Sequence, residues 1–260
     1  MLIMKTLLAA LLITSPGYAD LIEKSVPYRQ GETGLEGFHV YEDGVEGKRP
    51  AVLIIHQWTG LTDYEKMRAR MLAKLGYNVF AADIYGKGIR PQPPEAAKEA
   101  GKYKSDRPLY RARLLAGLEI LRGDERTDAD RIAAIGYCFG GTGVLELARS
   151  GAKIAGVVSF HGGLGAGEGL AASKGEVRTR ILALHGANDP FVPPSEIDAF
   201  WKEMQAAEAD WQLITYPGAV HAFTQQMAGN DPSRGAAYNE VADRRSWRDM
   251  KTFFDAIFAF

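Results

Sequence analysis

The hydrophobic residues of this chain are grouped into short continuous runs that alternate with longer amphipathic segments. Residues 51–55 (Ala-Val-Leu-Ile-Ile) are all apolar, and three of them are β-branched. Such a run is typical of a strand that is buried on both faces of a parallel sheet. Similar patterns predict further strands at 25–29, 35–41, 78–82, 131–136, 154–160, 180–184 and 211–216.

The segments between these runs carry apolar residues at helical spacing. Residues 63–75 have this spacing and end before Gly76, a residue type that commonly terminates helices. Strands that alternate with helices of ten or more residues form βαβ units around a mostly parallel sheet. The pattern therefore predicts one α/β domain with helices on both faces of the sheet. Further helices are expected at 108–121, 139–149, 194–207 and 240–260, and loops at 86–107 and 161–174.

The first nineteen residues have the layout of a secretory signal peptide. Lys5 provides a positive start, residues 7–13 form an apolar run, and the small residues Gly17 and Ala19 occupy the −3 and −1 positions of a cleavage site. The apolar run is far shorter than the roughly 20 residues that a membrane-spanning helix needs. We therefore expect residues 1–19 to be removed and residues 20–260 to form a single exported domain, periplasmic or secreted.

Composition and charge exclude some classes of partner. The chain is 46% hydrophobic and 24% charged, with a net charge of −1, so neither nucleic acid nor stable membrane insertion of the mature chain is indicated. Cys138 is the only cysteine and cannot form an internal disulfide. A lone cysteine is often just a small buried apolar residue, and composition alone does not separate that role from a reactive thiol.

The surroundings of Cys138 favour the reactive role. It lies in Gly136-Tyr137-Cys138-Phe139-Gly140-Gly141, between a predicted buried strand and a predicted helix. This is the context of a nucleophile elbow, in which glycines two residues before and after the nucleophile let the strand and helix approach closely. A dinucleotide-binding turn would need the spacing G-x-G-x-x-G, which is absent here. The helix N-terminus would favour the thiolate form of the cysteine.

Two further residues complete a predicted triad. The order along the chain in such folds is nucleophile, acid, histidine. Asp189 follows the predicted strand 180–184, and His221 lies in the loop after the strand 211–216. Catalytic groups of open α/β sheets gather at the carboxyl ends of the strands, so Cys138, Asp189 and His221 should converge there. His161 and His185 also follow strands, but neither has an acid placed to complete this order.

An oxyanion hole is expected beside the triad. The backbone N–H of Phe139 should supply one donor, and an N–H of Gln57 or Trp58, in the loop after strand 51–55, the second. An alternative for Trp58 is that it only packs against the following helix, as aromatic residues commonly do.

These motifs resemble the dienelactone hydrolase family of α/β-hydrolases, over residues from about 50 to 223. The resemblance implies an α/β-hydrolase fold, no metal or organic cofactor, and cleavage of a small ester or lactone through a thioester on Cys138. It also places Gln57, Tyr85 and Gln225 at the substrate pocket. It rests on His56-Gln57-Trp58-Thr59-Gly60, Ala82-Asp83-Ile84-Tyr85-Gly86, the elbow, His185-Gly186-Ala187-Asn188-Asp189 and His221-Ala222-Phe223.

Two positions depart from the family pattern. Gln57 stands where the family usually has a glutamate that helps to activate the cysteine. Gln225 stands near the point where dienelactone-cleaving members carry an arginine that binds the substrate carboxylate. Charge-assisted bonds to a carboxylate are about twice as strong as neutral ones, so their loss matters. We therefore expect a neutral ester or lactone rather than a dienelactone as substrate.

Two other functions stay open at this level. Gln57 also fits a periplasmic binding protein that keeps the fold but has lost turnover, and the single exported thiol fits a redox role. The chain is expected to act as a monomer or a small homo-oligomer.

Overall fold

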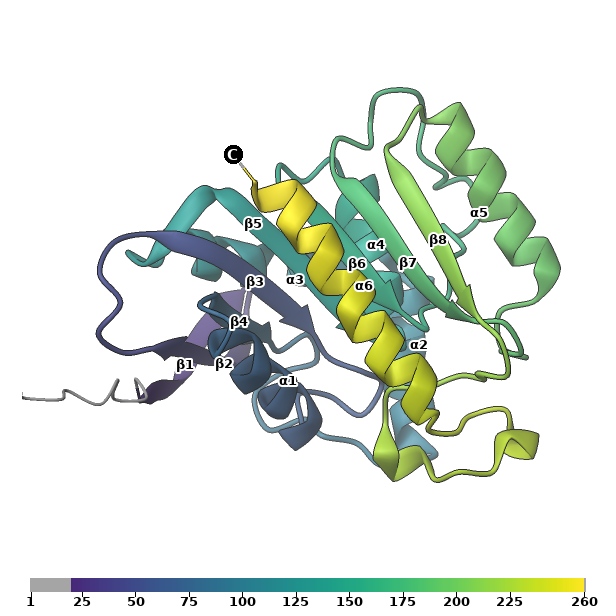
Figure 1. Cartoon of the computed structure of the whole chain (residues 1–260), viewed down its shortest axis with the longest axis horizontal. Coiled ribbons are helices and arrows are strands. Elements are labelled where there is room, and N and C mark those ends of the chain that lie inside the picture. Colours follow the sequence, from purple (N-terminus) through teal and green to yellow (C-terminus); the bar gives the residue numbers. More distant parts are fainter. Residues whose placement is uncertain (1–19, 260) are drawn as a thin grey trace, which may run out of the picture.

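A computed structural model describes residues 20–259 as one eight-stranded sheet with helices on both faces (Figure 1). The strand order is β1-β2-β4-β3-β5-β6-β7-β8. β1 and β2 form an antiparallel edge hairpin, β2 joins β4 antiparallel, and all later neighbours are parallel. The strands are β1 (Leu21–Gln30), β2 (Thr33–Glu42), β3 (Arg49–Ile55), β4 (Asn78–Ala82), β5 (Thr127–Tyr137), β6 (Gly156–Phe160), β7 (Arg180–Gly186) and β8 (Trp211–Tyr216).

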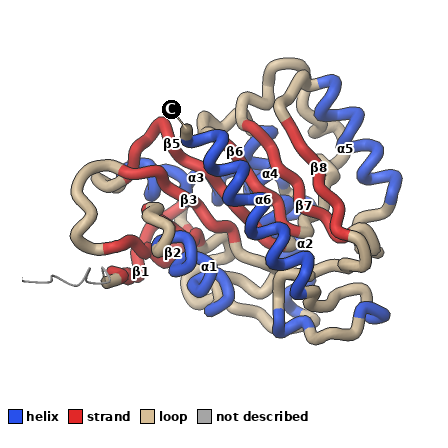
Figure 2. The backbone as a smooth tube through the Cα atoms, viewed as in Figure 1, coloured by secondary structure: helices blue, strands red, loops and turns tan. Residues whose placement is uncertain are grey.

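The helices divide into two layers. α1 and α6 pack on one face of the sheet, and α2, α3, α4 and α5 on the other, with α6 running across the near face in Figure 1. The tube of Figure 2 shows the helices enclosing the strands. The helices are α1 (Asp63–Ala73), α2 (Glu95–Ser105), α3 (Arg107–Gly123), α4 (Phe139–Arg149), α5 (Pro194–Ala206) and α6 (Glu240–Phe258), with short 3₁₀ turns at Gln226–Ala228 and Pro232–Arg234.

The central strand β3 shows why these sequences form this sheet. Leu53 and Ile55 belong to the core under α3 and α4, whereas Val52 and Ile54 belong to the core under α1 and α6. Successive side chains of a strand point to opposite faces, so a strand covered on both sides must be apolar throughout. The continuous run 51–55 therefore marks the middle of the sheet, and the α/β prediction is confirmed.

One helix was not predicted. The segment 86–107 is expected to be a loop, but residues 95–105 of it form α2. Three prolines before it and Gly101 within it weaken the helical signal, because proline and glycine are poor helix formers. The helix is stabilised by burial instead: Ala96, Ala100 and Tyr103 lie on one side of it and are covered by the rest of the domain.

The N-terminal predictions remain partly outside the described residues. The expected signal peptide, residues 1–19, falls on residues that the structure does not describe. Within residues 20–259, no helix has the length and apolar character needed to cross a membrane.

Candidate active site

Cys138 lies in a sharp turn between β5 and α4, as the elbow motif predicts. Its backbone has φ 54° and ψ −112°, in the region that non-glycine residues rarely adopt. The two flanking glycines are required by close packing. A Cβ on Gly136 would lie 2.0 Å from the Gly140 carbonyl oxygen, and one on Gly140 would lie 2.2 Å from that of Ile55. The local sequence therefore holds the thiol at the carboxyl edge of the sheet in a strained conformation.

The structure brings Cys138, His221 and Asp189 together although they are far apart in the sequence. The Cys138 Sγ lies 3.0 Å from His221 Nε2, and His221 Nδ1 lies 2.8 Å from Asp189 Oδ2. The other carboxylate oxygen of Asp189 accepts the backbone N–H of Phe191 at 2.9 Å. This is the geometry of a nucleophile, a base and an orienting acid.

The environment of the pair favours a thiolate and an imidazolium. Burial disfavours charge on both side chains. The positive charge and hydrogen bond of His221 outweigh burial and lower the pKa of the Cys138 thiol. Conversely, the thiolate and Asp189 raise the pKa of His221 to about 10. Both shifts favour the pair of thiolate and imidazolium, and the thiolate is the reactive form of a cysteine.

The loop between β3 and α1 holds Gln57 and Trp58, the two residues predicted to offer a backbone amide to an oxyanion. The N–H of Gln57 donates to Glu65 Oε1 at 3.2 Å, so it is already used. The Trp58 carbonyl accepts the Tyr85 hydroxyl at 2.9 Å, while the Trp58 N–H has no hydrogen-bond partner among residues 20–259. The N–H of Phe139 also helps to lower the pKa of the Cys138 thiol. Of the two predicted donors in this loop, the Trp58 N–H is the one that is not already bonded.

Comparison with known proteins places this chain in a family. The sequence profile described as "Dienelactone hydrolase family" matches residues 35–258, most of the chain. The chain belongs to the dienelactone hydrolase family. It is therefore a hydrolase that acts on a small ester or lactone, on an α/β-hydrolase fold, and the predictions of family, fold and enzyme class are confirmed.

Three of the proteins that this chain resembles cover between 56% and 91% of it. A crystal structure of a dienelactone hydrolase-like promiscuous phosphotriesterase from metagenomic libraries is 36% identical, with a TM-score of 0.86, covering 91% of this chain and 98% of that one. A probable 2-oxo-3-(5-oxofuran-2-ylidene)propanoate lactonase of a Bradyrhizobium species is 28% identical over 79% of this chain and 83% of its own. An uncharacterized protein of Caenorhabditis elegans is 36% identical over 56% of this chain and 93% of its own.

The three predicted pocket residues occupy different environments in this dienelactone hydrolase-like domain. Gln57 is partly exposed in the loop after β3. Tyr85 is buried between His56 and Phe139, with ring centroids 4.6 and 5.3 Å away. Gln225 is buried, and its side-chain Nε2 has no hydrogen-bond partner in the described chain. Tyr85 thus supports the loop that contains Trp58, because its hydroxyl donates to the Trp58 carbonyl, and the Gln225 side chain is uncharged.

Two supporting residues are absent from the sequence-based predictions. Glu65 is fully buried and binds the N–H of Gln57, and its other oxygen accepts the N–H and hydroxyl of Thr62 at 2.8 and 2.7 Å. The spacing Thr62-x-x-Glu65 is that of a helix capping box, which the sequence does contain. His161 lies with its ring 5.3 Å from that of His221, but not within reach of the thiol as a base.

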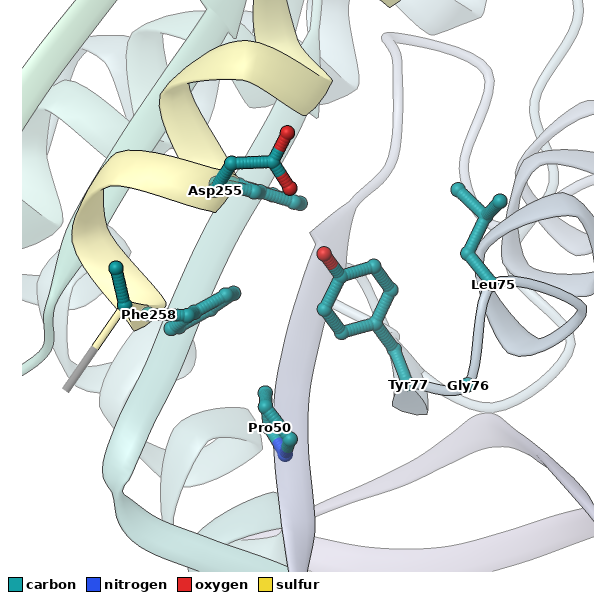
Figure 3. A pocket seen from close by; sticks show the side chains of 8 residues that line it. Pro50, Leu75, Gly76, Tyr77, Asp255 and Phe258 are labelled. Carbon is teal, nitrogen blue, oxygen red and sulfur yellow. The ribbon is translucent and has the colours of Figure 1, made fainter.

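The hollow in Figure 3 is not this site. It has a volume of about 320 Å³ and lies between the start of β3, the turn before β4 and the end of α6. Pro50, Tyr77 and Phe258 line it, near the amino ends of the strands, whereas the triad lies at their carboxyl ends. Within residues 20–259, no cluster of three or more histidine, cysteine or carboxylate side chains is arranged to hold a metal ion.

Proposed function

We propose that this hydrolase cleaves neutral carboxylic esters or lactones through a thioester on Cys138. The observation that carries the proposal is the 3.0 Å contact between the Cys138 sulfur and His221 Nε2, with Asp189 bound to the other ring nitrogen. The family membership supports the reaction class, and the triad geometry supports the assignment of the individual roles.

In the first half of the proposed reaction, the Cys138 thiolate attacks the substrate carbonyl carbon. The carbonyl oxygen becomes an oxyanion, which the N–H groups of Phe139 and Trp58 stabilise by hydrogen bonds. The C–O bond to the leaving group then breaks, and the His221 imidazolium donates its proton to the departing alkoxide. A thioester remains on Cys138, and an alcohol leaves or, for a lactone, stays tethered to the acyl chain.

In the second half, neutral His221 takes a proton from a water molecule that attacks the thioester carbonyl. The C–S bond breaks, the carboxylic acid leaves, and Cys138 returns as a thiolate beside the protonated histidine. Asp189 orients the imidazole and stabilises its charge throughout, as its 2.8 Å contact allows.

The pocket residues favour an uncharged substrate. Gln57 and Gln225 supply no positive charge for a substrate carboxylate. Phe191 adds an apolar surface: its ring lies edge-on to that of His221, with centroids 5.4 Å apart, and is 60% exposed. An alkyl or aryl group can cover this ring and be removed from water there.

Two further points extend the proposal. The layout of residues 1–19 supports export to the periplasm or the medium. A second substrate class follows from the 36% identical phosphotriesterase, since a thiolate that attacks a carbonyl carbon can also attack a phosphorus centre. Paraoxon therefore belongs beside the esters in an activity screen.

The test is hydrolysis of p-nitrophenyl acetate by the chain from Asp20 onward, beside the variants Cys138→Ala and His221→Ala. The expected result is turnover by the parent and background rates for both variants, with all three proteins folded by circular dichroism. Turnover that survives in Cys138→Ala contradicts the proposed nucleophile. A parent that is alkylated by iodoacetamide but turns over no ester or lactone supports a binding protein instead.

A further inference from the structure

His161 is a fully buried histidine that the proposed chemistry does not use. It follows β6 directly and has φ 41°, a left-handed conformation that is rare for a non-glycine residue. Its ring lies edge-on to the catalytic His221 ring, with centroids 5.3 Å apart, and also contacts Phe223 at 5.1 Å. A buried, strained histidine beside a catalytic base needs a physical explanation, because burying an imidazole is costly unless it is hydrogen-bonded.

Both ring nitrogens of His161 are hydrogen-bonded, and to different catalytic segments. Nδ1 accepts the backbone N–H of Cys138 at 3.2 Å, a donor that is shared with the Phe160 carbonyl at 3.0 Å. Nε2 lies 2.8 Å from Thr224 Oγ1. Because Nδ1 faces a donor, the ring proton is on Nε2 and is donated to Thr224. Thr224 lies three residues after His221 on the same loop, so the ring joins the nucleophile to the loop of the base.

The bridge continues beyond Thr224 into two helices. Thr224 Oγ1 lies 2.7 Å from the Tyr64 hydroxyl, which accepts the Arg68 Nε–H at 3.3 Å. Arg68 also donates to the Thr224 carbonyl at 3.0 Å and pairs with Asp243 at 2.6 Å. Tyr64 and Arg68 belong to α1, and Asp243 to α6. The network thus anchors the His221 loop to the layer of helices that covers one face of the sheet.

The charge state of His161 suits this role. Burial and the positive charges of His221 and Arg68 hold the pKa of His161 well below its usual range. The ring is therefore neutral while His221 is protonated, and its Nδ1 lone pair stays available for the Cys138 amide. A protonated ring would lose that acceptor and would repel the His221 imidazolium.

We propose that His161 is a positioning residue that sets the separation of Cys138 and His221 by linking the Cys138 amide to Thr224. Cys138 and His221 are 83 positions apart in the sequence, so the local chain cannot fix the distance between their side chains. The ring of His161 is a short, rigid spacer between the two segments. Small errors in such a distance have large effects on proton transfer and ion-pair strength.

The test combines His161→Phe and Thr224→Val with their double variant. Phenylalanine keeps the ring but has no nitrogen, and valine keeps the shape of threonine but has no hydroxyl. We expect each single variant to lower the iodoacetamide alkylation rate of Cys138 and the kcat for an ester by about tenfold, with KM changed by less than about threefold. The double variant should be no worse than either single one, because both remove the same link. Thr224→Ser, which keeps the hydroxyl, should restore parent rates.

A matched control separates positioning from general stability. His39 is also a buried histidine, bonded to Asn78 at 2.7 Å in the β2–β4 region away from the triad. His39→Phe should lower the melting temperature but leave the Cys138 alkylation rate unchanged. The proposal is overturned if His161→Phe and Thr224→Val keep parent alkylation and kcat within twofold, or if their effects add. Should His161→Phe fail to fold, Thr224→Val against Thr224→Ser decides the question by the same readouts.

The kcat readout rests on the proposed function, but the alkylation readout does not. A parent without ester turnover whose Cys138 still loses reactivity in both variants would refute the proposed function and leave the role of His161 supported.

Discussion

Replacing Asp189 by asparagine tests the electrostatic core of the site. The Asp189 side chain is fully buried and that of His221 is 14% exposed, so water can do little to replace the carboxylate. Asparagine has nearly the same shape but no charge. A hydrogen bond to a charged group contributes about 1.5–3 kcal/mol. Each 1.4 kcal/mol is a factor of about ten, so the thiolate–imidazolium pair should become at least tenfold and up to about a hundredfold less favoured.

Two measurements follow this loss in Asp189→Asn. The kcat/KM for p-nitrophenyl acetate at pH 7.5 and the alkylation rate of Cys138 should both fall by at least tenfold. The pKa of the Cys138 thiol, followed by thiolate absorbance in the ultraviolet, should rise because His221 is less readily protonated. The control is Asp249→Asn on α6. This substitution removes a carboxylate that is bonded to the hydroxyl of Tyr216 in β8, and it should leave both rates unchanged. Parent-like rates in Asp189→Asn would refute the reasoning.

Three other predictions follow from the same contacts. The pH profile of kcat/KM should be bell-shaped. Activity falls as the pH drops through the lowered pKa of Cys138, where the thiolate is lost, and as the pH rises through about 10, where His221 loses its proton. An alkaline limb near pH 7 would contradict the raised pKa of His221. Glu65→Gln removes an acceptor from Gln57 or Thr62, so a thermal melt should show a loss of about 1–3 kcal/mol together with a lower kcat; an unchanged kcat would mean that the loop of Trp58 does not depend on Glu65. Gly140→Ala places a methyl group 2.2 Å from the Ile55 carbonyl oxygen, so chemical denaturation should show a free energy of unfolding lower by about 1–3 kcal/mol or more. Gly101→Ala on α2, where a Cβ meets nothing within 4 Å, should be neutral or stabilising. Equal stability of the two variants would argue against the close approach of strand and helix.

The sequence predicts those elements best whose limits are set by local chemistry. β4, β8 and α4 match the predicted bounds at both ends. α4 begins at Phe139 because the elbow forces a turn at Cys138, and this turn is encoded by two glycines. α2 could not be predicted in the same way, because its stability comes from Ala96, Ala100 and Tyr103 packing on the rest of the domain.

The same distinction between local chemistry and contacts of distant segments applies to the candidate site. The triad follows from chain order and strand ends, since parallel strands bring their carboxyl ends to one edge of the sheet. The choice of Trp58 over Gln57 as amide donor needs the contact of Gln57 with Glu65. The bridge through His161 depends on β5, β6, β7 and β8 lying side by side, which places Thr224 next to a residue 63 positions earlier. Such pairings between distant segments leave no periodic pattern in the sequence.

The central claim is that Cys138 is the nucleophile, and stoichiometric alkylation tests it most directly. Because Cys138 is the only cysteine, iodoacetamide modifies a single thiol, and the modified fraction can be read by intact-mass spectrometry. Ester hydrolysis measured on samples at increasing extents of modification should fall in direct proportion to the modified fraction and reach background when the thiol is fully blocked. A fully alkylated protein that still hydrolyses the ester at the parent rate would contradict the account.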